Sequence, residues 1–587
     1  MKSKWLVYAK KADFKAIEQK YGIDQVIARI MRNRDVCTDE EMQMYLNGSI
    51  DGLHAPELLK DAQKAVDILT EKIAQHKKIR IIGDYDIDGI CSITILYKAL
   101  KKAGADVDYV VPHRITDGYG INEHLIDNAA AEGKDTILTC DNGIAAIDEI
   151  AWAKAQKMTV LVTDHHAVPF EEHEGRRTEK KSLADAVVNP HQQDCGYPYK
   201  ELCGAGVAWN VIRVLYENYD MDKREAEDLL DFVAMATVCD VMSLTGENRI
   251  LVKEGLKRIR HTKNIGLQAL MQACNVQPEN ISAYHFGYVL GPCVNATGRL
   301  DTARHALRLF ETGQETEAEE IARDLVDLNQ ERKELTLQGV EMAKKLCEEG
   351  GYENDPVLVL FLPDVHESIA GLIAGRIREM YNRPVFVLTR GEEGVKGSGR
   401  STENYSMYEN MCGCAELFTK FGGHPMAAGL SLPEENVEKF RRKINENCPL
   451  TVEEVCPDIH IDMAMPVGYA STELVHQFAL LEPFGKDNPS PLFADRNLSI
   501  SRMWLIGKNR NVLRMSVLSE YGQPVPVIFF GDVETLFAYF TEKFGQEEVE
   551  NALHGRKNRI LFSMVYTAKI DFYQGNENLQ LEMKYYR

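Results

Sequence analysis

The chain has 587 residues, of which 44% are hydrophobic and 27% are charged. This length allows about four domains of ordinary size, and the composition excludes extended disorder, collagen-like repeats and a coiled-coil rod. The net charge of -21 argues against attraction to a polyanion by total charge. It leaves open a nucleic-acid enzyme, because a cluster of metal-binding carboxylates adds acids while a local basic groove can still bind phosphates.

The apolar and cysteine residues indicate a protein without membrane spans or disulfides. No apolar run approaches the roughly 18 residues that cross a bilayer, and the N-terminus has no apolar core or cleavage site of a secretory signal. The 13 cysteines are scattered and odd in number, and Cys412 and Cys414 have no second pair at zinc-site spacing. We therefore expect free thiols, a cytoplasmic location and no membrane partner.

The first half of the chain predicts helices followed by an α/β domain. Residues 1–75 have apolar side chains at helical spacing and are predicted as an N-terminal helical region. From residue 76 to 315, short β-branched runs alternate with helical stretches, which predicts a doubly wound parallel sheet. The expected strands are 79–82, 107–111, 136–139, 159–162 and 186–188.

Three further segments complete the predicted architecture. A long amphipathic pattern predicts a connecting helix over 316–350. A second, smaller α/β domain is expected over 351–450, with glycine-rich segments at 397–401 and 422–429. Residues 451–587 have short alternating segments and few helical patterns, which predicts a C-terminal β-barrel.

Acidic residues and histidines follow three of the predicted strands. These residues are Asp84, Asp86 and Asp88 after the first strand, Asp141 after the third, and Asp164, His165 and His166 after the fourth. In open α/β sheets ligands bind at the carboxyl ends of the strands, so we expect these side chains to converge.

Several carboxylates at one place require cations, because like charges a few ångströms apart cannot all ionise. Histidine and aspartate ligands without cysteine favour manganese, iron or zinc over calcium, whereas magnesium prefers oxygen ligands alone. Two ions about 3.5 to 4 Å apart can stabilise both the attacking and the leaving oxygen of a phosphodiester displacement.

Two simpler interpretations compete with a metal centre. The segment from Asp84 to Gly89 fits the first half of an EF-hand loop, but position twelve would be Ile95 where a bidentate glutamate is required, and a strand precedes it. A single aspartate after a strand is often a helix cap, so Asp141 is assigned to the site only because the other two motifs accompany it.

Four motifs resemble, in order and spacing, those of the DHH phosphoesterase superfamily. They are GDYDIDG at 83–89, CDNG at 140–143, TDHH at 163–166 and the aspartate in ATVCDVMSL at 236–244. Further segments resemble the RecJ family of single-strand-specific exonucleases: LHAPELL at 53–59, GPCVNATGRLD at 291–301, GSGRS at 397–401, FGGHPMAAGLSL at 421–432 and LEPFGKDNPSPLF at 481–493. This resemblance covers essentially the whole chain, with modest departures at Val365, Ser368 and Asp487.

The resemblance implies a metal-dependent exonuclease that degrades single-stranded DNA from the 5′ end to 5′-mononucleotides, in repair and recombination. It implies two divalent ions, manganese or magnesium, with these ligands: Asp84, Asp86, Asp88, Asp141, His165 and Asp240. His166 would face the scissile phosphate, and Asp164 would orient a histidine. A helicase and a single-strand-binding protein are the implied protein partners.

Substrate contacts are expected from residues in several of the motifs. They are Arg114, Tyr119, Arg299, Arg376, Arg400, Gly422, Gly423 and His424. A guanidinium suits bidentate phosphate contacts, and Tyr119 is expected to stack a base. The Gly-Gly-His segment is predicted as a turn with exposed N–H groups, and the C-terminal barrel resembles an OB-fold, which binds single strands.

Two alternative functions stay open. Enzymes of the same superfamily act on short oligonucleotides or cyclic dinucleotides, although they generally end after the second α/β domain. A non-catalytic relative that binds DNA or serves as a scaffold would have lost metal ligands, and every expected ligand is present here.

Overall fold

The computed structural model describes residues 3–113, 117–173, 176–300, 302–352, 354–391, 394–451, 455, 457–507, 510–573 and 575–587. The chain divides into two compact units. Unit 1 combines residues 1–3, 54–242 and 254–457, and unit 2 combines residues 4–53, 243–253 and 458–587. Over the described ranges, we find no helix with the length and apolar character needed to cross a membrane.

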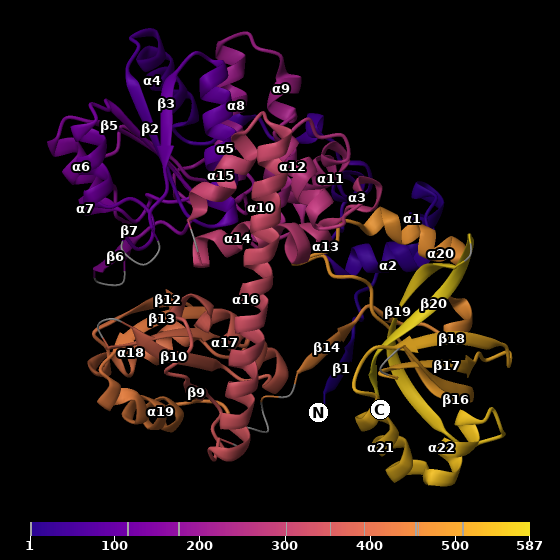
Figure 1. The fold of residues 1–587 in the computed structure, drawn as a ribbon. Helices are drawn as coiled ribbons and strands as arrows, with labels where there is room; N and C mark the ends of the chain where they lie inside the picture. The colour runs from indigo at the N-terminus through magenta and orange to yellow at the C-terminus, as the bar shows by residue number, and fades with distance from the viewer. Residues whose placement is uncertain are drawn as a thin grey trace. The chain divides into compact units, whose positions relative to one another are not determined.

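Unit 1 begins with a five-stranded parallel sheet in the order β3-β2-β4-β5-β8 (Figure 1). Its strands are β2 (Lys78–Gly83), β3 (Asp106–Val110), β4 (Thr136–Cys140), β5 (Thr159–Thr163) and β8 (Ala186–Val188). Along the chain, a hairpin of β6 (Phe170–His173) and β7 (Arg176–Glu179) comes between strands β5 and β8. The predicted doubly wound parallel sheet is confirmed.

Helices cover both faces of this sheet (Figure 1). On one face, α6 (Glu123–Ala131) and α7 (Ile147–Ala155) bury Leu125 and Ile150 against the strands. On the other face lie α4 (Ala62–Ala74), α5 (Ile87–Lys102) and α8 (Gly204–Asn218). Burial on both faces explains the continuous apolar character of β4 and β5.

A helical region follows the sheet. Its elements are α9 (Lys223–Glu227), α10 (Leu230–Cys239), α11 (Gly246–Ile259), α12 (Ile265–Ala273), α13 (Ala283–His285), a π-helix η4 (Phe286–Leu290), α14 (Gly291–Leu300) and α15 (Ala303–Glu311). The predicted connecting helix is confirmed as α16 (Glu315–Glu349), which has 35 residues. At 1.5 Å per residue it is about 52 Å long.

A smaller mixed sheet follows α16, in the order β12-β13-β11-β10-β9. Its strands are β9 (Leu358–Phe361), β10 (Val385–Gly391), β11 (Gly394–Arg400), β12 (Lys420–His424) and β13 (Ala427–Leu432). One face packs against α16 and α17 (Glu367–Tyr381), and the other packs against α18 (Met407–Cys412) and α19 (Val437–Glu446). This agrees with the predicted second α/β domain.

One local prediction in this sheet is wrong. Gly422, Gly423 and His424 form the end of strand β12 and pair with Gly429, Ala428 and Ala427 of β13, instead of forming a turn. The chain reverses at Pro425 and Met426, because proline cannot donate to the strand ladder. Gly422, Gly423 and His424 are exposed and belong to the edge strand of this sheet.

Unit 2 is built on a six-stranded sheet in the order β15-β16-β17-β18-β20-β19, closed into a ring by pairing between β16 and β19. Its strands are β15 (Met463–Ala464), β16 (Phe493–Ile506), β17 (Val512–Leu518), β18 (Pro524–Phe529), β19 (Leu561–Tyr573) and β20 (Asn576–Tyr586). Helices α20 (Thr472–Gln477), α21 (Val533–Phe544) and α22 (Gln546–Leu553) accompany the ring. The predicted C-terminal β-barrel is confirmed.

The N-terminal residues are divided between the two units. Helices α1 (Phe14–Tyr21), α2 (Gln25–Asn33) and α3 (Asp39–Asn47) belong to unit 2, and β1 (Lys4–Val7) pairs with β14 (Asp458–Ile461). The apolar face of α2, including Ile27 and Ile30, is buried in the same core as the barrel strands. By contrast α4 packs in unit 1, so residues 1–75 do not form the single helical region that their pattern suggests.

Candidate metal centre

The three acidic loops lie at the carboxyl ends of β2, β4 and β5, which are adjacent strands. Asp86 caps α5, and its carboxylate accepts hydrogen bonds from the N–H groups of Asp88 and Gly89. This tight turn directs the neighbouring side chain of Asp88 inward, where it is 1% exposed. Asp240 comes from farther along the chain, at the C-terminus of α10.

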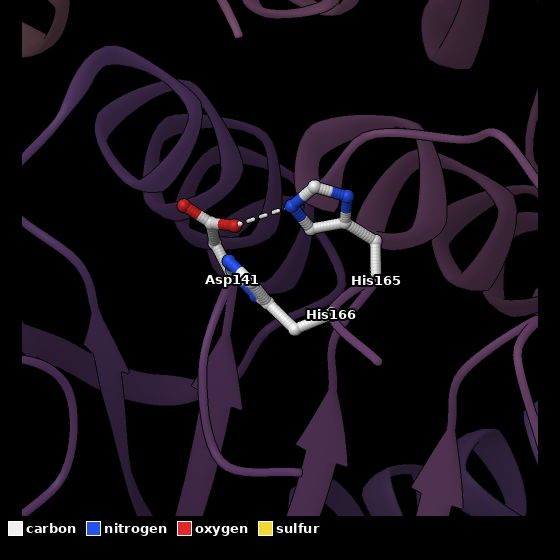
Figure 2. Close-up of side chains that lie close together, drawn as sticks. All are labelled: Asp141, His165 and His166. Atoms are coloured by element: carbon white, nitrogen blue, oxygen red, sulfur yellow. Dashed lines mark ion pairs between the residues drawn. The ribbon is translucent and has the colours of Figure 1, made fainter. Parts of the chain in front are cut away.

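His165 is the centre of the cluster. Its Nε2 lies 3.1 Å from Asp141 Oδ1, 3.6 Å from Asp88 Oδ2 and 3.7 Å from Asp240 Oδ2. Figure 2 shows the His165 ring directed at the Asp141 carboxylate, with His166 beside them. The structure thus brings side chains from four separate segments to one point.

Among the residues that the structure describes, three overlapping groups have ligand atoms within 4.8 Å of one another. They are Asp84, Asp86 and Asp141; Asp88, His165 and Asp240; and Asp141, His165 and His166. Asp141 belongs to two of these groups and lies between them. All six expected ligands are therefore members of one continuous cluster.

Electrostatic repulsion inside the cluster is strong. Burial, together with the carboxylates of Asp88, Asp86, Asp84 and Asp240, raises the pKa of Asp141 well above its ordinary value. Burial and the charge of Asp86 likewise raise the pKa of Asp88. Asp141 Oδ1 is buried and receives no hydrogen bond within the described ranges, although His165 Nε2 is near.

The donor set fits divalent cations. Cations relieve the repulsion between carboxylates, and carboxylate and imidazole ligands without cysteine suit manganese, with magnesium favoured by the oxygen-rich side. The buried Asp141 oxygen without a donor is the kind of atom that a cation satisfies.

Asp164 does not join the metal ligands but holds His166. Its Oδ1 accepts hydrogen bonds from the N–H groups of His165 and His166 and lies 2.8 Å from His166 Nδ1. Its Oδ2 accepts the N–H of Ile144. Burial alone would raise the pKa of Asp164, but these bonds and the His166 charge lower it.

His166 is charged more readily than an ordinary histidine. Burial opposes its charge, but the hydrogen bond and the negative charge of Asp164 outweigh burial and raise the pKa of His166 to about 9. The Tyr119 hydroxyl lies 3.3 Å from His166 Nε2 and donates to the carbonyl of Asp141. Tyr119 is thus placed beside the acidic cluster, with its ring edge-on to His166.

Several positioning residues are missed by sequence reasoning. The N–H groups of Gly204 and Ala205, at the start of α8, donate to the two oxygens of Asp88 at 2.6 and 2.7 Å. Asn295 of α14 accepts the N–H of Ile87. The Gly-Ala-Gly sequence at 204–206, which opens the apolar helix α8, is a visible signal for the first contact, because a helix N-terminus with small residues can approach an anion.

The four arginines expected to contact the substrate differ in their surroundings. Arg299 donates to the carbonyl of Ser368, and Arg400 donates to the carbonyl of Gly399. Arg376 has a 69% exposed side chain on α17, 3.6 Å from Glu379. Arg114 lies outside the described residues.

A cavity of about 430 Å³ lies beside the cluster in unit 1. Tyr85, Gly118 and Tyr119 line one side, and the smaller sheet with the start of α17 lines the other. The smaller sheet contributes Lys396, Ser398, Lys420, Gly422 and Ser431. Of these five residues, only Gly422 is a predicted substrate contact, although Lys396 and Lys420 directly precede two of the glycine motifs.

Family models match three parts of the chain. The N-terminal domain of the DHH family matches residues 78–237, the DHHA1 domain matches residues 354–448 and the RecJ OB domain matches residues 461–585. These matches fall on the parallel sheet, the smaller mixed sheet and the barrel.

Curated relatives match over nearly the whole chain. The single-stranded-DNA-specific exonuclease RecJ of Haemophilus influenzae is 32% identical over 581 residues, covering 95% of this chain and 96% of that protein. RecJ of Escherichia coli is 31% identical, covering 95% and 94%. RecJ of Bacillus subtilis is 31% identical, covering 89% of this chain and 65% of that longer protein.

Two solved structures of a RecJ protein have a fold similar to that of this chain. The crystal structure of RecJ from Thermus thermophilus in complex with Mn²⁺ has a TM-score of 0.81 and 25% identity, covering 100% of this chain and 79% of that one. The Mg²⁺ complex of the same protein has a TM-score of 0.74.

Proposed function

Because this chain belongs to the RecJ family of single-stranded-DNA-specific exonucleases, we propose that it removes nucleotides from the 5′ end of single-stranded DNA and releases 5′-mononucleotides. The observation that carries this proposal is the convergence of Asp88, Asp141 and Asp240 on His165, beside a cavity lined by lysines and tyrosines. The direction of cleavage and the role in repair and recombination rest on the family resemblance.

Asp84, Asp86, Asp88, Asp141, His165 and Asp240 would hold two divalent ions, manganese or magnesium. When bound, such ions activate water and neutralise charge on the phosphodiester as it is displaced. Asp141, which lies in two of the groups, is the proposed shared ligand. Gly204 and Ala205 keep the Asp88 carboxylate in place through their N–H groups.

His166 is the proposed partner of the reacting phosphate. Asp164 holds Nδ1 of its ring, and Nε2, which has the Tyr119 hydroxyl 3.3 Å away, would contact a phosphate oxygen or give a proton to the leaving 3′ oxygen. Release of a 5′-mononucleotide breaks the bond from phosphorus to that 3′ oxygen and leaves a 5′-phosphate on the shortened strand. The same contacts can then accept the next nucleotide.

The cavity is the proposed path of the strand. Lys420 supplies positive charge in a protein with a net charge of -21, whereas Lys396 is paired with Glu367 of the same cavity at 2.8 Å. Tyr85 and Tyr119 line the side nearest the metal cluster. Arg299 and Arg400 are proposed phosphate contacts from the motifs. The exposed position of Arg376 on α17 gives no support to such a role. A helicase and a single-strand-binding protein remain predicted partners.

The test is a long single strand labelled at either end, given with Mn²⁺, Mg²⁺ or chelator, beside a matched duplex and a dinucleotide. We expect metal-dependent release of mononucleotides from the 5′ end of the single strand only. Asp141→Ala should abolish it and also abolish the rise in melting temperature caused by Mn²⁺. Preference for the dinucleotide would indicate the small-substrate branch, and binding without cleavage would indicate a scaffold.

A further inference from the structure

Two cysteine thiols of unit 1 lie in contact at a junction of three helices. Cys274 directly follows α12 and Cys293 lies in α14, and their Sγ atoms are 3.8 Å apart. Both helices pack against α16 (Figure 1). Cys293 is 2% exposed, and its Sγ also lies 3.3 Å from the carbonyl oxygen of Val289. Cys274 is only partly buried, so the pair lies at the boundary between core and solvent.

The surroundings of Cys293 stabilise a thiolate. The side-chain amide of Asn329 in α16 donates to Cys293 Sγ at 3.3 Å, and the Arg332 guanidinium donates to the Asn329 side-chain oxygen at 2.9 Å. A hydrogen bond from the Cys274 thiol is the largest effect that lowers the pKa of Cys293, and burial opposes it. The Asn329 amide and the charges of Lys333 and Arg332 lower this pKa further.

Buried cysteines of the parallel-sheet domain have the opposite character. Burial and the charge of Asp88 raise the pKa of Cys91 and of Cys140 well above the ordinary value of a thiol. Such thiols are inert, because the thiolate is the nucleophile and these surroundings suppress it. Cys293 has an amide donor, nearby cations and a second thiol in contact, which are the features of a cysteine that oxidants attack.

Helix α14 also packs on the turn that carries two of the proposed metal ligands. Asn295 of α14 accepts the N–H of Ile87 at 2.9 Å, and Ile87 lies between those two ligands. A β-carbon at Gly298 of α14 would lie 2.5 Å from the carbonyl oxygen of Tyr85. Because the helix and the turn are in such close contact, a displacement of α14 is transmitted to the turn.

We propose that Cys274 and Cys293 form a site of reversible oxidation, at which hydrogen peroxide closes a disulfide that displaces α14 and lowers the exonuclease activity. The Cys293 thiolate attacks one peroxide oxygen, which gives a sulfenic acid and a hydroxide that takes up a proton. The Cys274 thiol then attacks the sulfenic sulfur, forms the S–S bond and releases water. In sum, two thiols and one peroxide give one disulfide and two waters, and two electrons pass from sulfur to oxygen.

Closing the bond changes the geometry at the helix junction. A disulfide has an S–S distance of about 2.05 Å, so the sulfurs of Cys274 and Cys293 must approach by about 1.8 Å from their present 3.8 Å. Asn295 is two residues from Cys293 and moves with it. The oxidation itself does not depend on the proposed function, whereas its effect on activity rests on it.

The experiment treats the full-length reduced protein with hydrogen peroxide in chelator, removes the peroxide, blocks free thiols with N-ethylmaleimide and maps disulfides by peptide mass spectrometry. We expect a cross-link between Cys274 and Cys293 that dithiothreitol removes. Activity is then measured on a single strand with Mn²⁺. It should fall at least about tenfold after oxidation, because small displacements in an active site cost large factors in rate, and dithiothreitol should restore it.

Two variants separate this pair from other oxidation. Cys274→Ser cannot close the bond, so its activity should persist after peroxide treatment. Cys412→Ser removes an exposed thiol in the smaller α/β domain and is the matched control, which peroxide should inactivate as it does the wild type.

Three results would overturn the proposal. They are the absence of the cross-link after oxidation, full activity of the cross-linked protein, and inactivation of Cys274→Ser as strong as that of the wild type. A reduced wild-type protein that degrades no strand would instead contradict the proposed function, and the peptide map would still test the cross-link.

Discussion

Gly204 lies so close to Asp141 that a β-carbon at position 204 would be 2.7 Å from Asp141 Cβ and 2.8 Å from Asp141 Oδ1. The same residue donates its N–H to Asp88 at 2.6 Å. The start of α8 therefore packs against one proposed metal ligand and holds another, and only glycine leaves room for both contacts.

Gly204→Ala should reduce metal-dependent activity at least about tenfold and weaken Mn²⁺ binding, because the new methyl group displaces the Asp141 carboxylate. The measurements are activity and calorimetric Mn²⁺ titration. Gly206→Ala is the matched control in the same helix, since its β-carbon would meet Leu202 at an ordinary 3.6 Å. Equal Mn²⁺ affinity in the two variants would contradict the proposed contact.

Asp164→Asn should lower kcat by about 10- to 100-fold with little change in KM, because the asparagine no longer fixes His166 with a negative charge. Steady-state kinetics on a single strand measures both constants. Asp185→Asn is a suitable control: Asp185 also accepts a backbone N–H, from Val160, but at the opposite end of the sheet. A change in KM alone would assign Asp164 to substrate binding.

Lys420→Ala should raise KM for a single strand several-fold at low salt, since the exposed ammonium group lines the proposed path. It should also lower the slope of log affinity against log salt by about 0.7, the value for one phosphate contact of a single strand. Lys439→Ala on the exposed face of α19 is the control. An unchanged slope would show that no phosphate is bound by Lys420.

The buried carboxyl group of Asp231 is expected to make the stability of the folded protein depend on pH. Burial of this carboxyl group raises the pKa of Asp231 to about 6. Hydrogen bonds donated by the Thr262 hydroxyl and the Phe232 N–H act in the opposite direction and lower the pKa, but burial outweighs them. A raised carboxyl pKa means that the folded protein favours the protonated form, so its stability falls as pH rises from about 4 to 6 and stays lower above that range.

Asp231→Asn should remove this penalty, because the amide is neutral and can donate to Thr262. The free energy of unfolding should exceed that of wild type by about 1 to 3 kcal/mol at pH 7.5, and the difference should approach zero at pH 4. Urea unfolding in chelator at both pH values measures it. Asp106→Asn at the exposed start of β3 is the control, and a difference independent of pH would refute the explanation.

Local sequence patterns predict the elements of this protein well. Each of the five parallel strands begins and ends within one residue of its expected position, and the connecting helix is found as a single element. The acidic loops follow from the same patterns, because strand ends in a parallel sheet must meet at one edge.

Other features depend on contacts between residues far apart in the chain. The sequence by itself determines which strands form and that Asp84, Asp86, Asp88, Asp141 and His165 gather at one edge, because side-chain spacing sets both. Only the tertiary structure decides that Gly204 holds Asp88, that Asp164 holds His166, and that residues 4–53 join the barrel. These outcomes depend on which surfaces pack together, and packing is a property of shape and burial that no local spacing records.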